Sequence, residues 1–112
     1  MASSVAQRAS RLGPLRLTRP TAAVLAALLA DPTRELYGLQ LMASTGLDSG
    51  TLYPMLRRLE SRGWLTSRLE DLDPREEGRP RRCYFRLTPD GAEQARARLS
   101  SAATSRRAGP DA

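Results

Sequence analysis

The side chains in this sequence that are best suited to chemistry are arginines, and the chemistry they suit is the binding of phosphate. Arg57 and Arg58 belong to a segment of helical periodicity, on or beside the face that carries no leucine. Arg79, Arg81 and Arg82 form a second group within four residues. Planar guanidinium groups match phosphate oxygens, so both groups predict contacts with nucleic acid. The alternative for each group is an ordinary solvated surface.

The residue inventory excludes most catalytic chemistry. Eighteen basic residues, all of them arginine, stand against 12 acidic ones, and the formal net charge is +6. The sequence has no histidine and no lysine, so the usual general bases and Schiff-base chemistry are absent. Cys83 is the single cysteine, which excludes an internal disulfide and a zinc site. We therefore predict no enzyme, no cofactor and no metal, and double-stranded DNA as the partner.

The first helix is predicted just after a basic N-terminal segment. Thr18 is a typical N-cap and Pro20 suits the first turn, while Asp31 before Pro32 ends the helix. The apolar run over residues 22–30 supplies the buried face. Arginines followed by such a run also occur in targeting segments, and that alternative stays open. The run is too short to span a bilayer, so no membrane partner is predicted.

A second helix is predicted over residues 34–45. Thr33 is placed to cap it, and Gly46 suits the position after its end. Apolar residues at helical spacing are expected to form its buried face: Leu36, Leu39, Met42 and Ala43.

The third helix has the clearest amphipathic pattern in the chain. Asp48 or Ser49 caps it, it runs to about Arg62, and Gly63 ends it. Pro54 lies on its exposed face and costs up to ~3 kcal/mol in a helix interior, which suggests a function for that face. Its apolar stripe follows the spacing i, i+3, i+4 and i+7: Leu52, Met55, Leu56 and Leu59.

Two strands and a last helix follow. Residues 64–70 and 82–88 read as strands, the second with clear period-two alternation, and residues 71–81 join them as a long polar loop. Thr88, with a proline and an acid directly after it, is a strong helix start, and the last helix is predicted over residues 89–101.

This order of elements predicts a mainly α fold with a small β-hairpin wing, a winged helix-turn-helix. The third helix would enter the major groove of DNA, and the wing would follow the backbone or the minor groove. Within that fold, Trp64 is expected in the core and Cys83 is expected as a small buried hydrophobe, with a redox-active thiol as the alternative for Cys83.

Two segments of the sequence resemble the PadR family of bacterial transcription regulators. The first is SGTLYPMLRRLESRGWL, which carries the family run Gly-Thr-Leu-Tyr-Pro, and the second is RPRRCYFRLTPDGAEQ. The resemblance covers residues 17–99. It implies a DNA-binding repressor, usually a homodimer, whose last helix makes the dimer contact. One departure from the family is that Gly38 is followed by Leu39 instead of tyrosine, and the nearby aromatic residue is Tyr37.

The resemblance and the arginine groups together define two sets of candidate residues. The DNA-binding set consists of Tyr37, Ser49, Gly50, Thr51, Tyr53, Pro54, Arg57, Arg58, Arg79, Arg81 and Arg82. The dimerisation set is the stripe of the last helix: Ala92, Ala95, Leu99 and Ala102. Because alanines bury little area, the N-terminal residues Leu12, Leu15 and Leu17 are expected to share the interface by packing on the last helix of the partner.

The predicted organisation has four parts. Residues 1–14 are a flexible tail, 15–88 form the winged helix-turn-helix, 89–101 form the dimerisation helix, and 102–112 form a second tail. We interpret the chain as a cytoplasmic, homodimeric repressor that binds a palindromic operator. Two alternatives remain: a winged-helix module for protein interaction, and a regulator that senses an unknown small-molecule effector.

Overall fold

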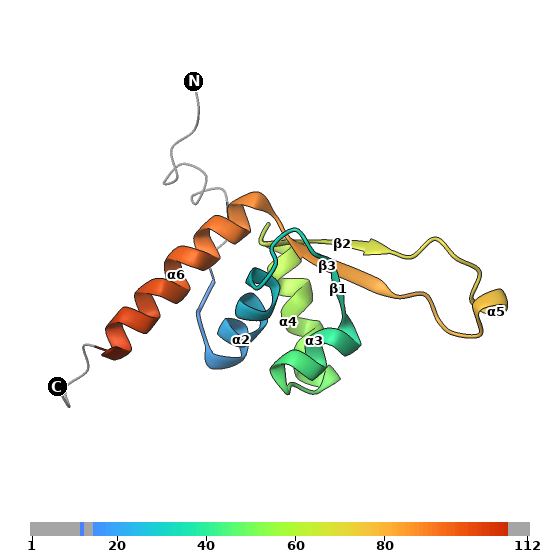
Figure 1. Cartoon of the computed structure of the whole chain (residues 1–112), viewed down its shortest axis with the longest axis horizontal. Helices are drawn as coiled ribbons and strands as arrows, with labels where there is room; N and C mark the ends of the chain where they lie inside the picture. The colour runs from blue at the N-terminus through green and yellow to red at the C-terminus, as the bar shows by residue number, and fades with distance from the viewer. Residues whose placement is uncertain (1–11, 13–14, 108–112) are drawn as a thin grey trace, which may run out of the picture.

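The computed structural model of the chain describes residue 12 and residues 15–107, with side chains up to residue 101. A helical body carries a wing on one side, and the last helix extends on the opposite side (Figure 1). The elements in chain order are α2 (Arg19–Leu29), β1 (Leu36–Tyr37), α3 (Gly38–Thr45), α4 (Ser49–Ser61), β2 (Leu65–Leu69), α5 (Pro74–Glu77), β3 (Cys83–Leu87) and α6 (Pro89–Arg107). The predicted winged helix-turn-helix is thereby confirmed.

Helix α2 begins and ends where the sequence predicts. The Thr18 side chain accepts a hydrogen bond from the backbone N–H of Thr21, so one of the free donors of the first turn is satisfied. Val24, Leu25 and Leu28 are fully buried.

The segment before α3 differs from the prediction. The Thr33 hydroxyl does not cap a helix; it donates to Asp31 Oδ1 at 2.8 Å in the preceding turn. The chain then forms the two-residue strand β1, in which Leu36 pairs with Phe85 of β3. Helix α3 starts only at Gly38. Its N-cap residue is Tyr37, whose backbone N–H donates to the Gln40 side-chain oxygen at 3.0 Å.

This later start also changes the buried face of α3. Leu41 is fully buried, whereas Leu39 is 66% exposed and Ala43 is exposed. The prediction of Leu39 and Ala43 as core residues was therefore wrong, because it rested on a helix that began four residues too early. Leu36 does belong to the core, but it enters from β1. Gly46 ends α3 with φ of 76°, as predicted.

Helix α4 follows the predicted pattern closely. Asp48, the first of the two predicted caps, accepts the backbone N–H of Thr51 at 2.8 Å. A hydrogen bond with the Thr51 side chain, and then this backbone hydrogen bond, lower the pKa of the Asp48 carboxyl. The predicted stripe is buried against the body of the domain, with exposed fractions of 5% or less: Leu52, Met55, Leu56 and Leu59.

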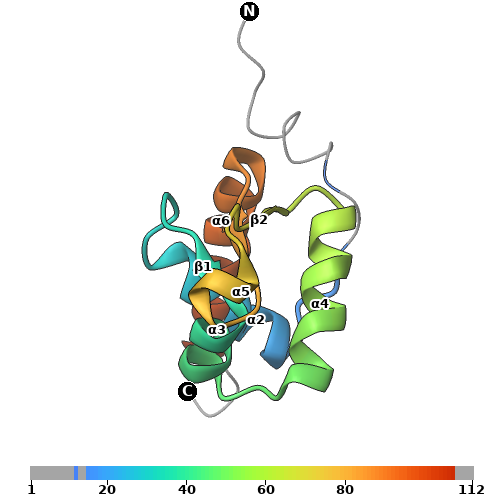
Figure 2. The same cartoon turned by 90° about the vertical axis from the view of Figure 1, so that its right-hand side faces the viewer.

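The sheet contains the two predicted strands and β1 as a third. Its order is β1-β3-β2, and both pairs are antiparallel. In Figure 2, which looks onto the wing from its tip, the one-turn helix α5 covers the end of the hairpin and α4 stands apart on one side of it. Phe85 and Leu87 point into the core, and Arg86 between them is exposed, as the period of two requires.

A tight junction fixes α6 to the end of β3. The Thr88 hydroxyl donates to the carbonyl of Gly63 at 2.7 Å and accepts the N–H of Gly91 at 2.9 Å. A Cβ atom at Gly91 would lie 2.3 Å from the carbonyl oxygen of Trp64, so only glycine fits there. Trp64 itself is buried in the core, as expected, and Cys83 packs against the core at intermediate exposure.

The predicted dimerisation surface is largely used inside the chain. Ala92 and Ala95 are 8% and 0% exposed because α6 packs on α2, so neither is available to a partner. Leu99 is partly buried against the same core, and the side chain of Ala102 lies outside the described residues. Helix α6 also continues past the predicted end at residue 101 to Arg107.

The N-terminal leucines pack within the chain as well. Leu12, Leu15 and Leu17 lie against the core of their own chain. Arg98 of α6 donates a hydrogen bond to the Leu15 carbonyl, which fixes this segment to its own last helix. Packing of these leucines on a partner's last helix stays a prediction, and it would require the segment to leave these contacts. Over the described residues, no helix is both long enough and apolar enough to span a membrane.

Candidate nucleic-acid interface

The outer face of α4 is fully presented to solvent. Its inner face is occupied by the leucine stripe, so the remaining positions must point outward. Seven of the residues predicted to bind DNA lie there, and all are exposed: Ser49, Gly50, Thr51, Tyr53, Pro54, Arg57 and Arg58. Arg57 shares one side of the helix with both Pro54 and Tyr53, because it follows them by three and four residues. This surface presents a phenol, a guanidinium and small polar groups together.

The Tyr53 ring packs over a glycine, Gly38, on the neighbouring helix. A Cβ atom at Gly38 would lie 1.9 Å from the Tyr53 hydroxyl and 2.7 Å from its Cζ, so the ring occupies the space that any other residue would need. Gly38 is buried under the ring, and Tyr53 remains 38% exposed. The phenol is therefore positioned at the junction of α3 and α4 with its outer side open.

A notch joins this junction to the wing. It has a volume of about 340 Å³ and is lined by Tyr37, Gly38, Leu39, Tyr53, Arg79, Pro80, Arg81, Arg82 and Cys83. The structure thus brings Tyr53 of α4 together with Tyr37 and all three predicted wing arginines. Leu39, which was predicted to lie in the core, instead lines the notch. It was missed as a surface residue because the start of α3 was misplaced.

Tyr37 connects the notch to the sheet through cation–π contacts and an edge-to-face contact between two tyrosine rings. The guanidinium carbon of Arg82 lies 4.3 Å from the centroid of the Tyr37 ring, within the range of a cation–π contact. The Tyr37 and Tyr84 rings meet edge to face at 5.5 Å. Arg68 covers the Tyr84 ring at 5.0 Å and forms an ion pair with Glu35 at 3.0 Å. Together these contacts fix the base of the wing to the start of α3.

Arg79 is bound within the wing by Glu70. Its Nη1 and Nη2 donate to Glu70 Oε1 and Oε2 at 2.7 and 3.2 Å. The same carboxylate accepts the backbone N–H of Arg82 at 2.8 Å and the Tyr84 hydroxyl at 3.3 Å. These donors, Arg79 first, lower the pKa of Glu70 to about 2. Sequence patterns gave no sign of this pair, because its members are nine residues apart across a long loop.

The other wing groups are divided between the notch and the tip. Arg81 is exposed, and its Nε donates to the Leu72 carbonyl at 2.8 Å, so its position is set while its terminal nitrogens stay available. The tip around α5 is acidic and forms a shallow depression with Arg81, lined by Asp71, Leu72, Asp73, Glu76 and Glu77. The acids therefore gather at the end of the wing, and Arg81 lines both this depression and the notch.

A second basic group lies on the opposite flank of α4. Arg58 lines a depression of about 190 Å³ together with Arg16, ahead of α2, and Arg62, at the end of α4. Sequence patterns had singled out only Arg58 of these three. Arg16 was assigned no role because nothing in its local sequence indicates that it lies beside α4. Both flanks of α4 thus carry arginines.

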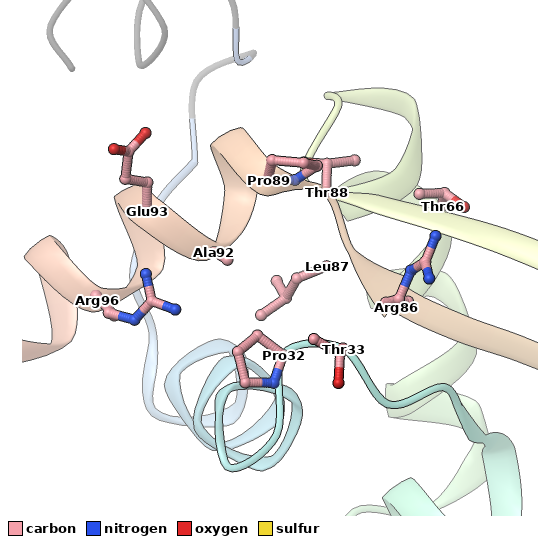
Figure 3. A pocket seen from close by; sticks show the side chains of 10 residues that line it. All are labelled: Pro32, Thr33, Thr66, Arg86, Leu87, Thr88, Pro89, Ala92, Glu93 and Arg96. Carbon is pink, nitrogen blue, oxygen red and sulfur yellow. The ribbon is translucent and has the colours of Figure 1, made fainter. Parts of the chain in front are cut away.

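A second groove, which shares no lining residue with the notch, lies beside the first turns of α6. It has a volume of about 730 Å³ and lies between the loop after α2, the strands β2 and β3, and the first turns of α6. Figure 3 shows Pro32, Leu87 and Ala92 along its floor and the side chains of Arg86 and Arg96 at its two ends.

Comparisons with known proteins agree with this geometry. The sequence profile described as "Transcriptional regulator PadR-like family" matches residues 24–97, which is more than half of the chain. The chain belongs to the PadR-like family of transcriptional regulators. PadR-like proteins are regulators of transcription and not enzymes, and the winged helix of this chain is a DNA-binding fold. No curated protein matched the chain.

Solved structures extend the comparison. A PadR family transcriptional regulator from Eggerthella lenta is 27% identical, with a TM-score of 0.62, over 77% of this chain and 76% of that one. Disulfide-formed AbfR is 26% identical, with a TM-score of 0.64, over 85% of this chain. BpsR of Bordetella bronchiseptica shares the fold at 22% identity and a TM-score of 0.63, over 95% of this chain and 71% of that one. This PadR-like chain spans 62% of AbfR.

Proposed function

We propose that this protein is a cytoplasmic, homodimeric repressor that binds a palindromic DNA operator. Helix α4 enters the major groove, where Tyr53, Pro54 and Arg57 contact base edges and Ser49 to Thr51 lie at its leading end. The wing follows the DNA backbone and uses Arg81 and Arg82 for phosphate contacts. Tyr37 supports the wing from the start of α3.

One observation carries this proposal: the notch places Tyr53 of α4 beside the wing arginines. A helix that reads bases needs cationic groups next to it, because the phosphates on both sides of the groove must be contacted at the same time. The second flank supplies Arg16, Arg58 and Arg62 for the other strand. Basic groups on both sides of an exposed helix fit a duplex better than a flat protein surface.

The dimer is proposed through the distal part of α6. One recognition helix reads only a few base pairs, and a twofold dimer places two such helices ~34 Å apart, one turn of DNA. Because Ala92 and Ala95 are buried, only Leu99 and Ala102 of the predicted stripe remain for the contact. Figure 1 shows this end of α6 running clear of the helical body, opposite the wing. A contact of this size supports a weak dimer.

Binding to DNA upstream of the protein's own gene tests the proposal against the protein-interaction alternative. Footprinting on that region, repeated at several salt concentrations, is expected to show one protected site whose occupancy falls steeply with salt. A module that only binds proteins gives no protected site. Protection that covers the whole fragment evenly, without a preferred site, contradicts an operator-binding repressor.

The groove beside α6 favours a second candidate function, the sensing of an effector. Arg86 and Arg96 flank an apolar floor, and the side chain of Glu93, the one acid in the lining, points away from that floor in Figure 3. The groove therefore suits a small anion with an apolar body. One protein with this fold, BpsR, is described as regulated in its DNA binding by 6-hydroxynicotinic acid. Melting curves with benzoate and with the neutral benzamide test this. Stabilisation by benzoate alone, lost in Arg96→Gln, supports an effector site, and equal curves for both compounds contradict it.

A further inference from the structure

One arginine of the wing, Arg79, lines the notch and has its terminal nitrogens bound within the protein. Arg79 lines the notch beside Tyr53 and Arg82, where a DNA backbone would pass. Its two terminal nitrogens are occupied by Glu70 in a fork-to-fork arrangement, the strongest geometry for an arginine–carboxylate pair. Nη1 donates in addition to the Pro80 carbonyl at 3.2 Å.

We propose that Glu70 is a positioning residue that withholds Arg79 from the phosphate backbone and so limits the sequence-independent affinity of the wing for DNA. This inference rests on the proposed function, in which the wing contacts phosphates. The wing contacts then come from Arg81 and Arg82. Glu70 favours specificity because it removes one contact that every DNA sequence would offer equally.

The position of Glu70 is fixed independently of Arg79. Its backbone N–H donates to the Arg82 carbonyl at 2.9 Å, and its Oε1 accepts the Arg82 N–H at 2.8 Å. The Tyr84 hydroxyl holds the other carboxylate oxygen. The Glu70 side chain is 14% exposed, so it cannot follow Arg79 outward.

The competition between Glu70 and a phosphate therefore favours Glu70. If Arg79 turned to a phosphate, the carboxylate would lose its main partner and would stand, negatively charged and mostly enclosed, close to the DNA. Turning Arg79 to a phosphate would therefore form one new contact and leave the charge of the Glu70 carboxylate uncompensated. The substitution Glu70→Gln introduces the neutral isostere and removes this penalty. The glutamine amide keeps an oxygen for the Arg82 N–H, and its NH2 group can donate to the Tyr84 hydroxyl oxygen, so the change falls mainly on the charge and on the link with Arg79.

The test is a double-mutant cycle on random-sequence duplex DNA with the full-length protein. The four proteins are wild type, Glu70→Gln, Arg79→Gln and the double variant, and the binding constant is measured by fluorescence anisotropy from about 0.05 to about 0.2 M salt. Each phosphate contact contributes ~0.9 to the slope of log binding constant against log salt. That equals about an eightfold change in affinity for each tenfold change in salt.

We expect Arg79→Gln to reduce the slope by ~0.9 per wing in the Glu70→Gln background and by less than half of that in the wild-type background. Glu70→Gln alone is expected to steepen the slope by ~0.9 per wing and to tighten binding severalfold. An equal reduction by Arg79→Gln in both backgrounds overturns the proposal, because Arg79 then contacts DNA whether or not Glu70 is present.

Two controls separate this effect from charge and from folding. Asp71→Asn removes the same charge one residue further along, at an exposed position. It is expected to raise affinity by an amount that does not depend on Arg79. Glu70→Asp keeps the charge and shortens the reach toward Arg79, so it serves if Glu70→Gln lowers the melting temperature. A cycle on Glu70→Asp that matches the wild-type background contradicts the proposal in the same way.

Arg81→Gln and Arg82→Gln separate this inference from the proposed function. If both lower the slope while the cycle is flat, only the role of Glu70 is wrong. If neither lowers it, the wing does not touch DNA and both proposals fail together.

Discussion

Gly38→Ala is expected to weaken DNA binding with little effect on folding. The new Cβ would lie 1.9 Å from the Tyr53 hydroxyl, and ordinary van der Waals contact begins at 3.4 Å, so the hydroxyl must move by 3.4 − 1.9 = 1.5 Å. Under the proposed function, a shift of that size breaks the hydrogen bond that the phenol would make to DNA. Such a bond contributes ~0.5–1.5 kcal/mol, which corresponds to a loss of affinity of about two- to thirteenfold.

The cost to folding is expected to be small because the obstacle is the end of a movable side chain. Glycine-to-alanine changes that fit the backbone stabilise by ~0.4–1 kcal/mol, and displacing a partly exposed ring offsets that gain. The unfolding free energy is therefore expected to stay within ~1 kcal/mol of wild type. Urea denaturation checks the folding, and anisotropy titration with a selected operator checks the binding.

Tyr53→Ala provides the matched background. Once the ring is absent, Gly38→Ala has nothing to displace and is expected to leave DNA affinity unchanged. Two results would refute the reasoning: unaltered operator binding by Gly38→Ala in the presence of Tyr53, or an undiminished loss in the Tyr53→Ala background.

Three further predictions address the core, the wing and the dimer. Leu56→Ala removes a fully buried side chain of α4 and is expected to lower the free energy of unfolding by ~2–5 kcal/mol. At about 4–8 °C per kcal/mol, the melting temperature falls severely. A decrease in the free energy of unfolding below ~1 kcal/mol would show that α4 is not packed as described. Arg79 first, with the Arg82 N–H and the Tyr84 hydroxyl, lowers the pKa of the Glu70 carboxyl to about 2. Because the folded pKa lies below the unfolded value, its stabilising effect is present above pH 4.5 and is lost as the pH falls toward 2. Carboxyl ¹³C NMR is therefore expected to show no titration of Glu70 near pH 4.5 in the wild-type protein and a higher pKa in Arg79→Gln. Leu99→Arg places a charge on the distal part of α6 and is expected to shift sedimentation at micromolar concentration toward monomer and to weaken operator binding in parallel; an unchanged dimer would place the contact elsewhere.

The elements that sequence patterns predicted correctly are those fixed by near neighbours. Helix α4 was predicted because Leu52, Met55 and Leu56 repeat at helical spacing and Asp48 caps the first turn. The start of α6 was predicted for the same reason, because a cap, a proline and an acid follow one another. In both cases the signal and the structure that it specifies lie within a few residues.

The features that were missed depend on contacts between distant residues. Strand β1 has two residues and exists only because Leu36 pairs with Phe85 of β3. Without that knowledge, Thr33 resembles a helix cap, and the error carries Leu39 into the predicted core. Ala95 resembled spare apolar surface, but its small size serves the close packing of α6 on α2.

The candidate site follows the same division. The outer residues of α4 could be predicted because they are the complement of a local leucine stripe. The pairing of Arg79 with Glu70 could not, because it requires the register of β2 against β3, in which Leu69 pairs with Cys83. The addition of Arg16 to the flank of α4 depends on how the segment ahead of α2 packs.

The proposed function requires that α4 recognises DNA bases and that Arg57 is one of the residues that contact them. Binding-site selection from a random duplex library measures this recognition directly. The wild-type protein is expected to enrich a twofold-symmetric motif whose half-sites lie about one turn apart. Arg57→Ala is expected to flatten one or two positions in each half-site, equivalent to ~1–3 kcal/mol of discrimination, while the remaining positions persist. An identical motif from Arg57→Ala would contradict the assignment of Arg57, and the absence of any enriched motif from the wild-type protein would contradict sequence reading by α4 itself.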